Sequence, residues 1–128
     1  MKYIGAASVA YLAPSGPIAF QVVCEDAVLP NQQALAIGII ANELVTNSLK
    51  YSFPDDRPGH IAVELSVTKG IELSVSDNGV GLGSEADPSG LGSRIVMLLT
   101  QQLEGDLTYE RLDRGLRVRL RAPAADVR

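Results

Sequence analysis

The spacing of apolar residues along the chain predicts strands and helices in a definite order. Short runs in which apolar and polar residues alternate are typical of strands with one buried face. Longer apolar runs that contain no cluster of breaking residues are typical of helices. The predicted strands are residues 18–24, 61–68, 71–76, 106–112 and 116–121, and the predicted helices are residues 32–51 and 90–104. Residues 1–13 are predicted to form a strand or a short helix.

Residues that favour turns separate these elements. Asn31 is expected to cap the first helix, which tolerates Gly38 at some cost in stability. Lys69 and Gly70 are expected to form a two-residue hairpin turn. Further loops and turns are predicted at residues 14–17, 52–59, 77–90 and 113–115. The order of the elements predicts an α+β two-layer sandwich, in which helices cover one face of a mixed, mostly antiparallel sheet.

Composition limits the size of the fold and the class of partner. The chain has 128 residues, of which 46% are hydrophobic, so we expect a single domain over residues 1–128. Its 11 basic and 15 acidic residues give a net charge of -4, which disfavours a nucleic-acid partner because such partners require clustered positive charge. The basic residues cluster only near the C-terminus, at Arg111, Arg114, Arg117, Arg119 and Arg121.

A single cysteine and a single histidine exclude several kinds of site. Cys24 has no second cysteine with which to form an intramolecular disulfide. Zinc sites built from cysteine and histidine need three or four such ligands, and Cys24 and His60 are too few. We therefore expect Cys24 to be a small core residue and His60 to be a surface residue at the start of a strand.

The longest apolar run, residues 34–41, is ended by Asn42 and Glu43. It is far shorter than the ~20 residues of a membrane-spanning helix. The N-terminus shows no apolar segment followed by a cleavage site, so no signal peptide is predicted. These features predict a soluble, cytoplasmic chain.

Polar residues gather on one side of the C-terminal half of the first predicted helix. At 100° per residue, the following positions fall within one sector of about 140°. They are Asn42, Glu43, Thr46, Asn47 and Lys50. One turn earlier the same side carries Ala36, Ile39 and Ile40, which are expected to be buried. The polar sector is therefore confined to the end of the helix.

This polar sector has the chemistry of a site for a metal and an anion. Oxygen donors from Glu43 and Asn47 suit Mg²⁺, which prefers hard oxygen ligands and retains several waters. Lys50 would neutralise the charge of a phosphate. A simpler interpretation, in which the end of the helix emerges into water, is favoured by the spacing alone.

Two glycine-rich segments have the chemistry of a nucleotide site. Asp77 follows a predicted strand, and its carboxylate is suited to accept a hydrogen bond from an exocyclic amine, while Gly79 and Gly81 let a flat ring approach the backbone. Residues 90–92 open the second helix, where free N–H groups favour phosphate. Each segment alone also fits an ordinary turn or helix start. The sequence lacks a P-loop motif and the glycine spacing of a dinucleotide fingerprint.

Taken together, three segments resemble the motifs of the GHKL ATPase superfamily, which includes DNA gyrase and the histidine kinases. Residues 42–54, NELVTNSLKYSFP, resemble the N box and are most similar to histidine kinases of the HWE type, whose box reads NELVTNALKHAFP. DNGVGL at residues 77–82 resembles the G1 box, and SGLG at residues 89–92 resembles the G2 box. The resemblance covers residues 18–121 and implies the Bergerat fold, a two-layer α/β sandwich.

The resemblance implies that the domain binds ATP and Mg²⁺, and it gives the motif residues their roles. Asn47 would bind Mg²⁺, Glu43 would orient water at the metal or assist proton removal from the acceptor, and Lys50 would contact phosphate. Asp77 would bind the adenine amino group. The other residues implied in nucleotide binding are Tyr51, Gly79, Gly81, Leu82, Ser89, Gly90, Leu91 and Gly92.

Three departures from the family pattern matter for the implied function. Pro88 stands where many kinases have a glycine, which predicts a stiffer segment over the nucleotide. Leu116 follows Gly115 where threonine or serine is frequent, which removes a polar group near the nucleotide. The resemblance also implies a helical domain with a phosphoacceptor histidine, which we expect to be absent from residues 1–128, and His60 is not placed to replace that histidine.

The implied function is that of the catalytic, ATP-binding domain of a sensor histidine kinase. Such a domain transfers the γ-phosphate of ATP to a histidine on a separate helical dimerisation domain, which in turn serves a response regulator. The isolated domain is expected to be a monomer and the full-length protein a homodimer, with or without attachment to a membrane. The alternatives are a serine kinase of the anti-sigma-factor type and a non-catalytic phosphotransfer or binding module of the same fold.

Overall fold

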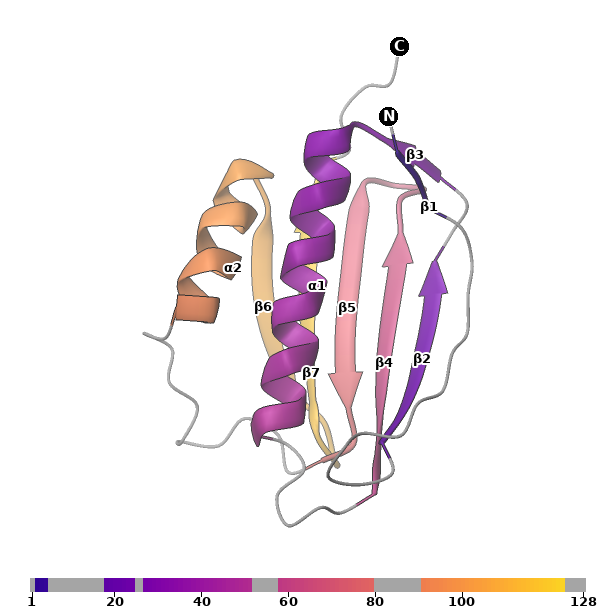
Figure 1. Ribbon diagram of the computed structural model, residues 1–128, viewed down its shortest axis with the longest axis vertical. Coiled ribbons are helices and arrows are strands. Elements are labelled where there is room, and N and C mark those ends of the chain that lie inside the picture. Colours follow the sequence, from indigo (N-terminus) through magenta and orange to yellow (C-terminus); the bar gives the residue numbers. More distant parts are fainter. Residues whose placement is uncertain (1, 5–17, 25–26, 52–57, 80–90, 124–128) are drawn as a thin grey trace.

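A computed structural model of the chain describes residues 2–4, 18–24, 27–51, 58–79 and 91–123 (Figure 1). In chain order, its elements are β1 (Lys2–Ile4), β2 (Ile18–Cys24), β3 (Ala27–Leu29), α1 (Asn31–Tyr51), β4 (Gly59–Ser66), β5 (Ile71–Asp77), α2 (Leu91–Gln102), β6 (Asp106–Arg111) and β7 (Leu116–Ala122). The predicted strands and both predicted helices are confirmed, with shifts of a few residues at their ends. The predicted turn at residues 14–17 lies outside the described residues.

The main sheet has five strands, in the order β2-β4-β5-β7-β6. β2 runs parallel to β4, whereas the other neighbouring strands are antiparallel. α1 stands between β2 and β4 in the chain and supplies the crossover that a parallel pair requires. β1 and β3 form a separate antiparallel pair. The sheet is therefore mixed and mostly antiparallel, as predicted.

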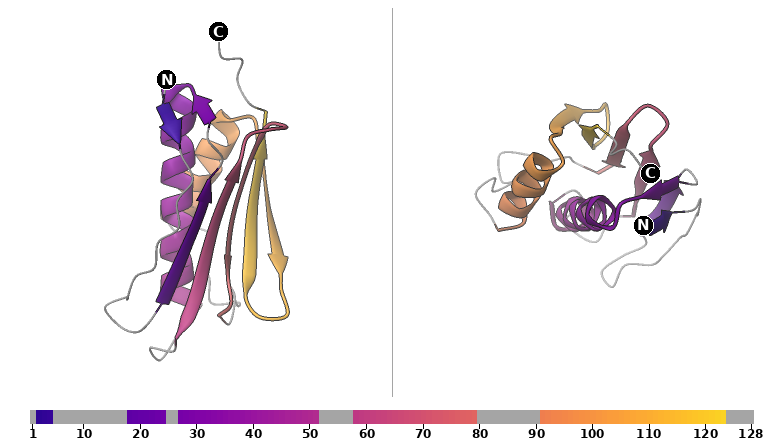
Figure 2. Two further views of the ribbon diagram at one scale, coloured as in Figure 1. Left: turned by 90° about the vertical axis from the view of Figure 1, so that its right-hand side faces the viewer. Right: turned by 90° about the horizontal axis from the view of Figure 1, so that it is seen from above.

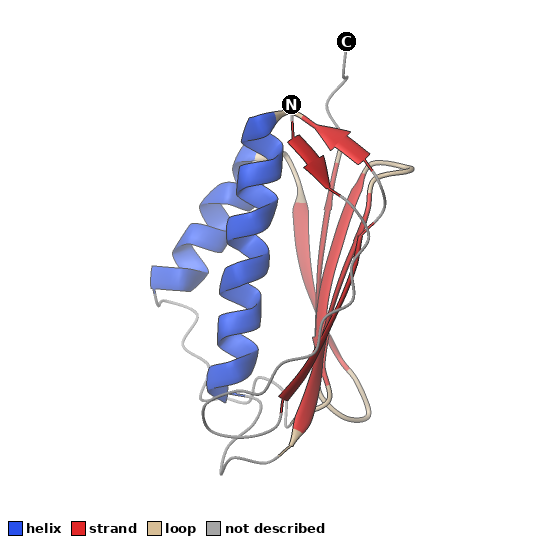
Figure 3. Cartoon of the chain, turned by 45° about the vertical axis from the view of Figure 1, so that its right-hand side comes forward, coloured by secondary structure: helices blue, strands red, loops and turns tan. Residues whose placement is uncertain are grey.

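Both helices cover the same face of this sheet, so the domain has two layers (Figures 2 and 3). The apolar core fills the space between the layers, where Ile40 of α1, Leu73 of β5 and Leu120 of β7 are almost completely buried. In β5 every second residue points into this core, which is the period expected for a strand with one covered face. Asp77, the last residue of the strand, occupies such an inward position.

α1 presents a stripe of side chains to the sheet because its buried residues are spaced by three and four. Ile37, Ile40 and Leu44 belong to this stripe, and Ser48 continues it at the C-terminal end of the helix. The stripe thus changes from apolar to polar within its last turns. Gly38 lies on the exposed side of the helix.

The predicted N-cap of α1 is wrong by one residue. The first helical hydrogen bond is donated by the backbone N–H of Ala34 to the carbonyl oxygen of Pro30, at 3.0 Å. Asn31 is therefore the first residue inside the helix rather than the residue that caps it.

The predicted two-residue turn between β4 and β5 is also wrong. Ser66 pairs with Glu72, so an odd number of residues lies between the last paired positions and Lys69 is at the apex. A two-residue turn would leave an even number. Gly70 has a φ of 103°, a value that glycine adopts readily and that lets the longer connection close.

The sheet face away from the helices carries charged side chains that pair across strands. Glu72 of β5 lies 3.3 Å from Arg119 Nε and 3.5 Å from Arg121 Nε, both on β7. Arg117 of β7 lies 3.3 Å from Glu110 of β6. The Arg119 contact is an ion pair without hydrogen-bond geometry. Because these groups are partly exposed, each pair contributes at most about 1 kcal/mol.

Cys24, expected in the core, and His60, expected at the surface, are both half-buried. Cys24 is half-buried and packs against the core, and this burial raises the pKa of its thiol. His60 is the second residue of β4, and its backbone N–H donates a hydrogen bond to Asn78 Oδ1 at 2.7 Å. Among the residues described, neither α1 nor α2 contains a segment suited to span a membrane.

Candidate functional site

The C-terminal end of α1 and the end of β5 meet at one end of the sandwich (Figure 1). There the Ser48 hydroxyl of α1 donates a hydrogen bond to Asp77 Oδ2 of β5, at 2.8 Å. Both residues are buried, with exposed fractions of 7% and 5%. The contact joins two of the segments that the sequence marks as functional, the N box and the G1 box.

Hydrogen bonds reach both oxygens of the Asp77 carboxylate. Oδ2 accepts the Ser48 hydroxyl, and Oδ1 accepts the backbone N–H of Gly79 at 3.0 Å. Burying a carboxylate is costly unless hydrogen bonds stabilise its charge. Both donors are neutral, so the negative charge of Asp77 is held in place without being cancelled by them.

The turn between β6 and β7 closes against the same residue. Gly115 has a φ of 99°, and a Cβ at this position would overlap the backbone carbonyl of Asp77 and approach Asp77 Oδ1 to 2.8 Å. Only glycine combines this backbone conformation with such a close approach. A residue distant in sequence therefore forms part of the wall around the carboxylate.

The polar sector of α1 lies beside this site and is graded in exposure. Glu43 and Asn47 are half-buried, whereas Asn42 and Lys50 are exposed. The Thr46 hydroxyl is engaged with the Asn42 backbone oxygen at 2.8 Å, which is an ordinary helix contact. Glu43 and Asn47 are four residues apart and share one side of the helix.

The prediction that this side of α1 is buried one turn before the polar sector is largely confirmed. One turn earlier, Ala36 and Ile40 are buried as expected, while Ile39 is only half-buried. The side of α1 that carries Glu43 and Asn47 thus changes from apolar to polar in the C-terminal half of the helix.

The remaining predicted site residues are only partly covered by the structure. Tyr51 ends α1, and Leu91 and Gly92 open α2, so the expected helix start at the G2 box is confirmed. Outside the described residues lie Gly81, Leu82, Pro88, Ser89 and Gly90.

The acidic residues that the structure describes form no cluster typical of a resident metal site. Within those residues, no group of three or more histidine, cysteine, aspartate or glutamate side chains is placed to hold a metal ion. The oxygen donors of Glu43 and Asn47 instead offer a small set of ligands. Such a set fits Mg²⁺, because this ion keeps several water ligands and takes others from the phosphates of a bound substrate.

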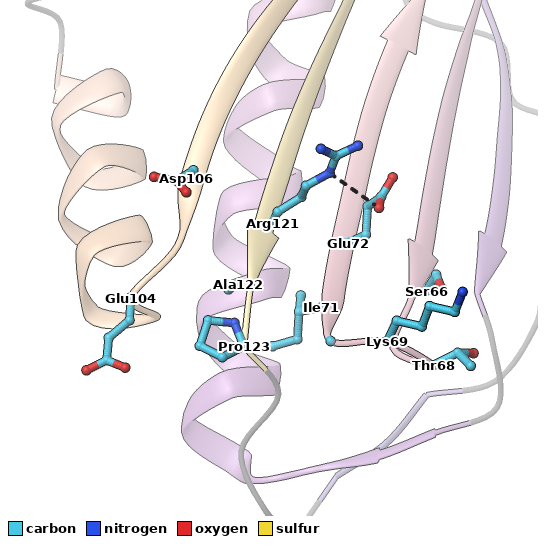
Figure 4. A pocket seen from close by; sticks show the side chains of 11 residues that line it. Ser66, Thr68, Lys69, Ile71, Glu72, Glu104, Asp106, Arg121, Ala122 and Pro123 are labelled. Atoms are coloured by element: carbon cyan, nitrogen blue, oxygen red, sulfur yellow. Dashed lines mark ion pairs between the residues drawn. The ribbon is translucent and has the colours of Figure 1, made fainter.

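Two cavities lie away from this site. A cavity of about 570 Å³ lies at the opposite end of β5, where Lys69, Glu72, Glu104 and Arg121 give it mixed charge (Figure 4). Another of about 450 Å³ lies between α1 and α2 and is lined by apolar and glutamine side chains. Neither contains a residue of the three sequence motifs.

Ser48 is a residue of the candidate site to which the sequence analysis gave no role. The burial of Ser48 could have been predicted from the sequence, because Ile40, Leu44 and Ser48 follow one another at intervals of four on the buried stripe. A hydroxyl on the buried side of a helix calls for a hydrogen-bond partner. The sequence did not show that this partner is Asp77, which lies in another element.

Several histidine kinases are similar to this chain in sequence or in fold. Residues 32–126 match the family described as Histidine kinase-, DNA gyrase B-, and HSP90-like ATPase. The chain is 31% identical to Blue-light-activated histidine kinase 2 of Erythrobacter litoralis, over 94% of this chain and 37% of that protein. The chain thus spans well under half the length of this relative.

The same similarity is found among solved structures. The histidine kinase domain from the Erythrobacter litoralis EL346 blue-light activated histidine kinase has a TM-score of 0.75 and 32% identity, over 83% of this chain and 51% of that one. The mycobacterial sensor histidine kinase MprB has a TM-score of 0.64 and 21% identity, over 86% of each chain, and supports the fold alone.

Proposed function

Because the chain belongs to the family of histidine kinase-, DNA gyrase B- and HSP90-like ATPases, we propose that it is the catalytic domain of a sensor histidine kinase. In this proposal it binds ATP with Mg²⁺ and transfers the γ-phosphate to a histidine on a separate helical dimerisation domain. The observation that carries the proposal is the buried, anchored carboxylate of Asp77, which lies beside the polar end of α1.

The adenine would lie against Asp77. A carboxylate accepts hydrogen bonds, and the amino group of adenine donates them. Gly79 and Gly81 would leave room for the ring beside the backbone, and Leu82 would contact it. Because its two described donors are neutral, Asp77 retains the charge that strengthens a bond to the amine.

The phosphates would extend from this end toward the polar sector of α1 and the start of α2. Asn47 would coordinate Mg²⁺, Glu43 would hold a water on the metal, and Lys50 would contact phosphate. The metal, when bound, supplies positive charge that lowers the repulsion between the phosphates and the incoming nucleophile. Other phosphate contacts would come from Tyr51, Ser89, Gly90, Leu91 and Gly92.

In the transfer step, an acceptor histidine nitrogen attacks the γ-phosphorus as the bond to the β,γ-bridging oxygen breaks. The attacking nitrogen is the unprotonated one, so the products are a phosphohistidine and ADP, and the proton that is lost leaves the other ring nitrogen of the acceptor imidazole. Glu43, which is half-buried on the polar side of α1, is suited to assist that loss. Catalysis of this kind depends chiefly on positioning and charge neutralisation.

The partners follow from this step. The acceptor histidine belongs to the helical dimerisation domain, and a response regulator would receive the phosphoryl group from it. The isolated chain would be a monomer, and the longer protein a homodimer through that helical domain. ATP as substrate supports a location in the cytoplasm.

A calorimetric titration of the chain with ATP, with and without Mg²⁺, tests nucleotide binding. We expect Asn47→Ala and Asp77→Asn to weaken Mg-ATP binding at least tenfold, and Asn47→Ala also to remove most of the Mg²⁺ dependence. Asn42→Ala is the matched control, because it removes an exposed amide from the same helix. A wild-type chain that binds no ATP would contradict the proposal.

Transfer is tested by mixing the chain, radiolabelled ATP and a helical dimerisation domain from the same protein. Label that is lost in acid and retained in alkali is expected, because a phosphohistidine has this stability. Acid-stable label on a partner serine would instead identify a serine kinase. Absence of transfer despite ATP binding would contradict the assignment as a catalytic domain.

A further inference from the structure

The Asp77 carboxylate needs donors to set its direction. The terminal torsion of an aspartate side chain is broad, so its orientation is decided by the surrounding groups. In this domain Gly79 N–H holds Oδ1 and the Ser48 hydroxyl holds Oδ2. With one donor assigned to each oxygen, both the plane and the direction of the carboxylate are defined.

The neighbouring strands offer Asp77 apolar side chains on the inner face of the sheet. Ile61 of β4 pairs directly with Asp77 and is completely buried. β7 pairs Arg117 with Ser76, and one further step of this register sets Leu116 opposite Asp77. Leu116 is buried too, with an exposed fraction of 6%. Neither side chain has a hydrogen-bond donor, whereas Ser48 above them on α1 has one.

Two of these positions, Ser48 and Leu116, differ from the pattern of the family that the chain resembles. Leu116 stands where threonine or serine is frequent, and Ser48 stands where the N box of HWE-type kinases has alanine. Ser48 contacts the Asp77 carboxylate, and continuing the register of β5 and β7 by one step sets Leu116 opposite the same residue. Compared with the family pattern, the chain therefore lacks a hydroxyl at position 116 of β7 and has an additional one at position 48 of α1.

We infer that Ser48 is the positioning residue that orients Asp77, and that it thereby sets the preference of the site for a 6-amino purine. This inference rests on the proposed function, because it takes Asp77 as the group that binds the adenine amine. Ser48 acts through Asp77 and needs no contact with the nucleotide. The Ser48 hydroxyl supplies a hydrogen-bond donor, which the leucine at position 116 lacks.

The test compares ATP with purine riboside triphosphate, which lacks the 6-amino group and retains the rest of ATP. The measured quantity is the ratio of the two dissociation constants in Mg²⁺. The wild-type chain is expected to prefer ATP by roughly tenfold or more, as one hydrogen bond to a charged group provides. Ser48→Ala is expected to reduce this preference to about twofold, chiefly because the variant binds ATP more weakly.

Three further variants separate positioning from general damage. Ser48→Thr keeps the hydroxyl and is expected to keep the preference. Ser48→Ala combined with Leu116→Thr returns a hydroxyl from the strand and is expected to restore at least half of the lost preference on a logarithmic scale. Ser76→Ala is the matched control, because Ser76 adjoins Asp77 in β5 but points to the other face of the sheet. Alanine is the residue most favourable to a helix, so Ser48→Ala is expected to fold.

The outcomes distinguish this inference from the proposed function. If the wild-type chain binds ATP and prefers it, but Ser48→Ala keeps the full preference, the inference is wrong and the proposed function stands. If Ser48→Ala weakens both nucleotides equally, Ser48 is merely structural and the inference is again wrong. If the wild-type chain binds neither nucleotide, the proposed function itself fails.

Discussion

The two ends of β5 each carry a carboxylate, and they hold it in opposite ways. Glu72, near the start of the strand, is half-exposed and lies 3.3 and 3.5 Å from two arginines that partly neutralise it. Asp77, at the other end, is buried and is held by a hydroxyl and an amide N–H. A carboxylate paired with cations in water is weakly held. One fixed by neutral donors keeps its charge and its direction, as a binding group must.

The largest expected effect comes from filling the close approach of Gly115 to Asp77. Gly115→Ala would place a methyl group against the Asp77 carbonyl at a positive φ, so we expect a loss of about 3 kcal/mol or more in unfolding free energy. Gly38→Ala is the control, since no atom lies within 4 Å of a Cβ there and the exposed helix should gain about 0.5–1 kcal/mol. Urea denaturation measures both. Equal stabilities of the two variants would contradict the described packing.

A smaller effect is expected from removing each carboxylate in turn. Asp77→Ala leaves the Ser48 hydroxyl and the Gly79 N–H without their acceptor, and we expect a loss of about 1–3 kcal/mol. Glu72→Ala removes only partly exposed ion pairs, with an expected loss below about 1 kcal/mol. Thermal unfolding compares them, at roughly 4 °C per kcal/mol for a domain of this size. A higher melting temperature for Asp77→Ala than for Glu72→Ala would reverse the comparison.

Salt is expected to change the stabilising effect of Glu72 but not that of Asp77. At 1 M NaCl the Debye length is about 3 Å, which screens the exposed pairs of Glu72 with Arg119 and Arg121. The destabilisation caused by Glu72→Gln is therefore expected to shrink by half or more between 0.05 and 1 M NaCl, on the order expected for surface charges. The destabilisation caused by Asp77→Asn should change little, because the Ser48 hydroxyl and the Gly79 N–H that bind its carboxylate are neutral. Equal salt dependence of the two variants in urea denaturation would contradict this distinction.

The smallest expected effect concerns Cys24, which pairs with Leu65 near the end of the sheet that carries Glu72. Burial raises the pKa of its thiol from the usual 9.0, because the charged thiolate is desolvated. Alkylation of Cys24 at pH 8.5 should therefore be slower in the folded chain than in urea. The difference between the two alkylation rates should shrink as the pH rises through the pKa of the folded chain. The corresponding contribution to stability is fully present below the unfolded pKa and is lost at higher pH.

Mass spectrometry of iodoacetamide adducts gives both alkylation rates. Ala62→Ser changes a half-buried residue of β4, which pairs with the edge strand β2 that carries Cys24. This variant is the control that shows how far a general loosening of the strand pairing raises the alkylation rate. Faster alkylation in the folded chain than in urea would show that burial does not suppress the thiolate.

The sequence predicted the elements well because each leaves a local pattern. The alternation in residues 71–76 and the apolar spacing of residues 34–44 act over distances that the sequence displays directly. The errors at Asn31 and at Lys69–Gly70 are also local, and they concern the end of an element, where a shift of one residue changes the hydrogen-bond pattern.

The site was predicted only as far as its motifs reach. Asp77 and the polar sector of α1 were expected, and the structure places them at one end of the sandwich. The neighbours of Asp77 from distant parts of the chain were not expected. Ser48 reaches it from α1, and Gly115 from the β6–β7 turn. Such contacts depend on tertiary packing and have no signature in a single sequence.

The parallel pairing of β2 with β4 has a consequence for how the domain forms. The β4–β5 and β6–β7 hairpins join neighbours in the chain and close with little loss of chain entropy. β2 pairs with β4 only after the whole of α1 has been carried across the sheet. We therefore expect α1 and β2 to dock late in folding. The bond between Ser48 and Asp77 would then be among the last to form, so the site becomes complete only when the slowest contacts of the fold are in place.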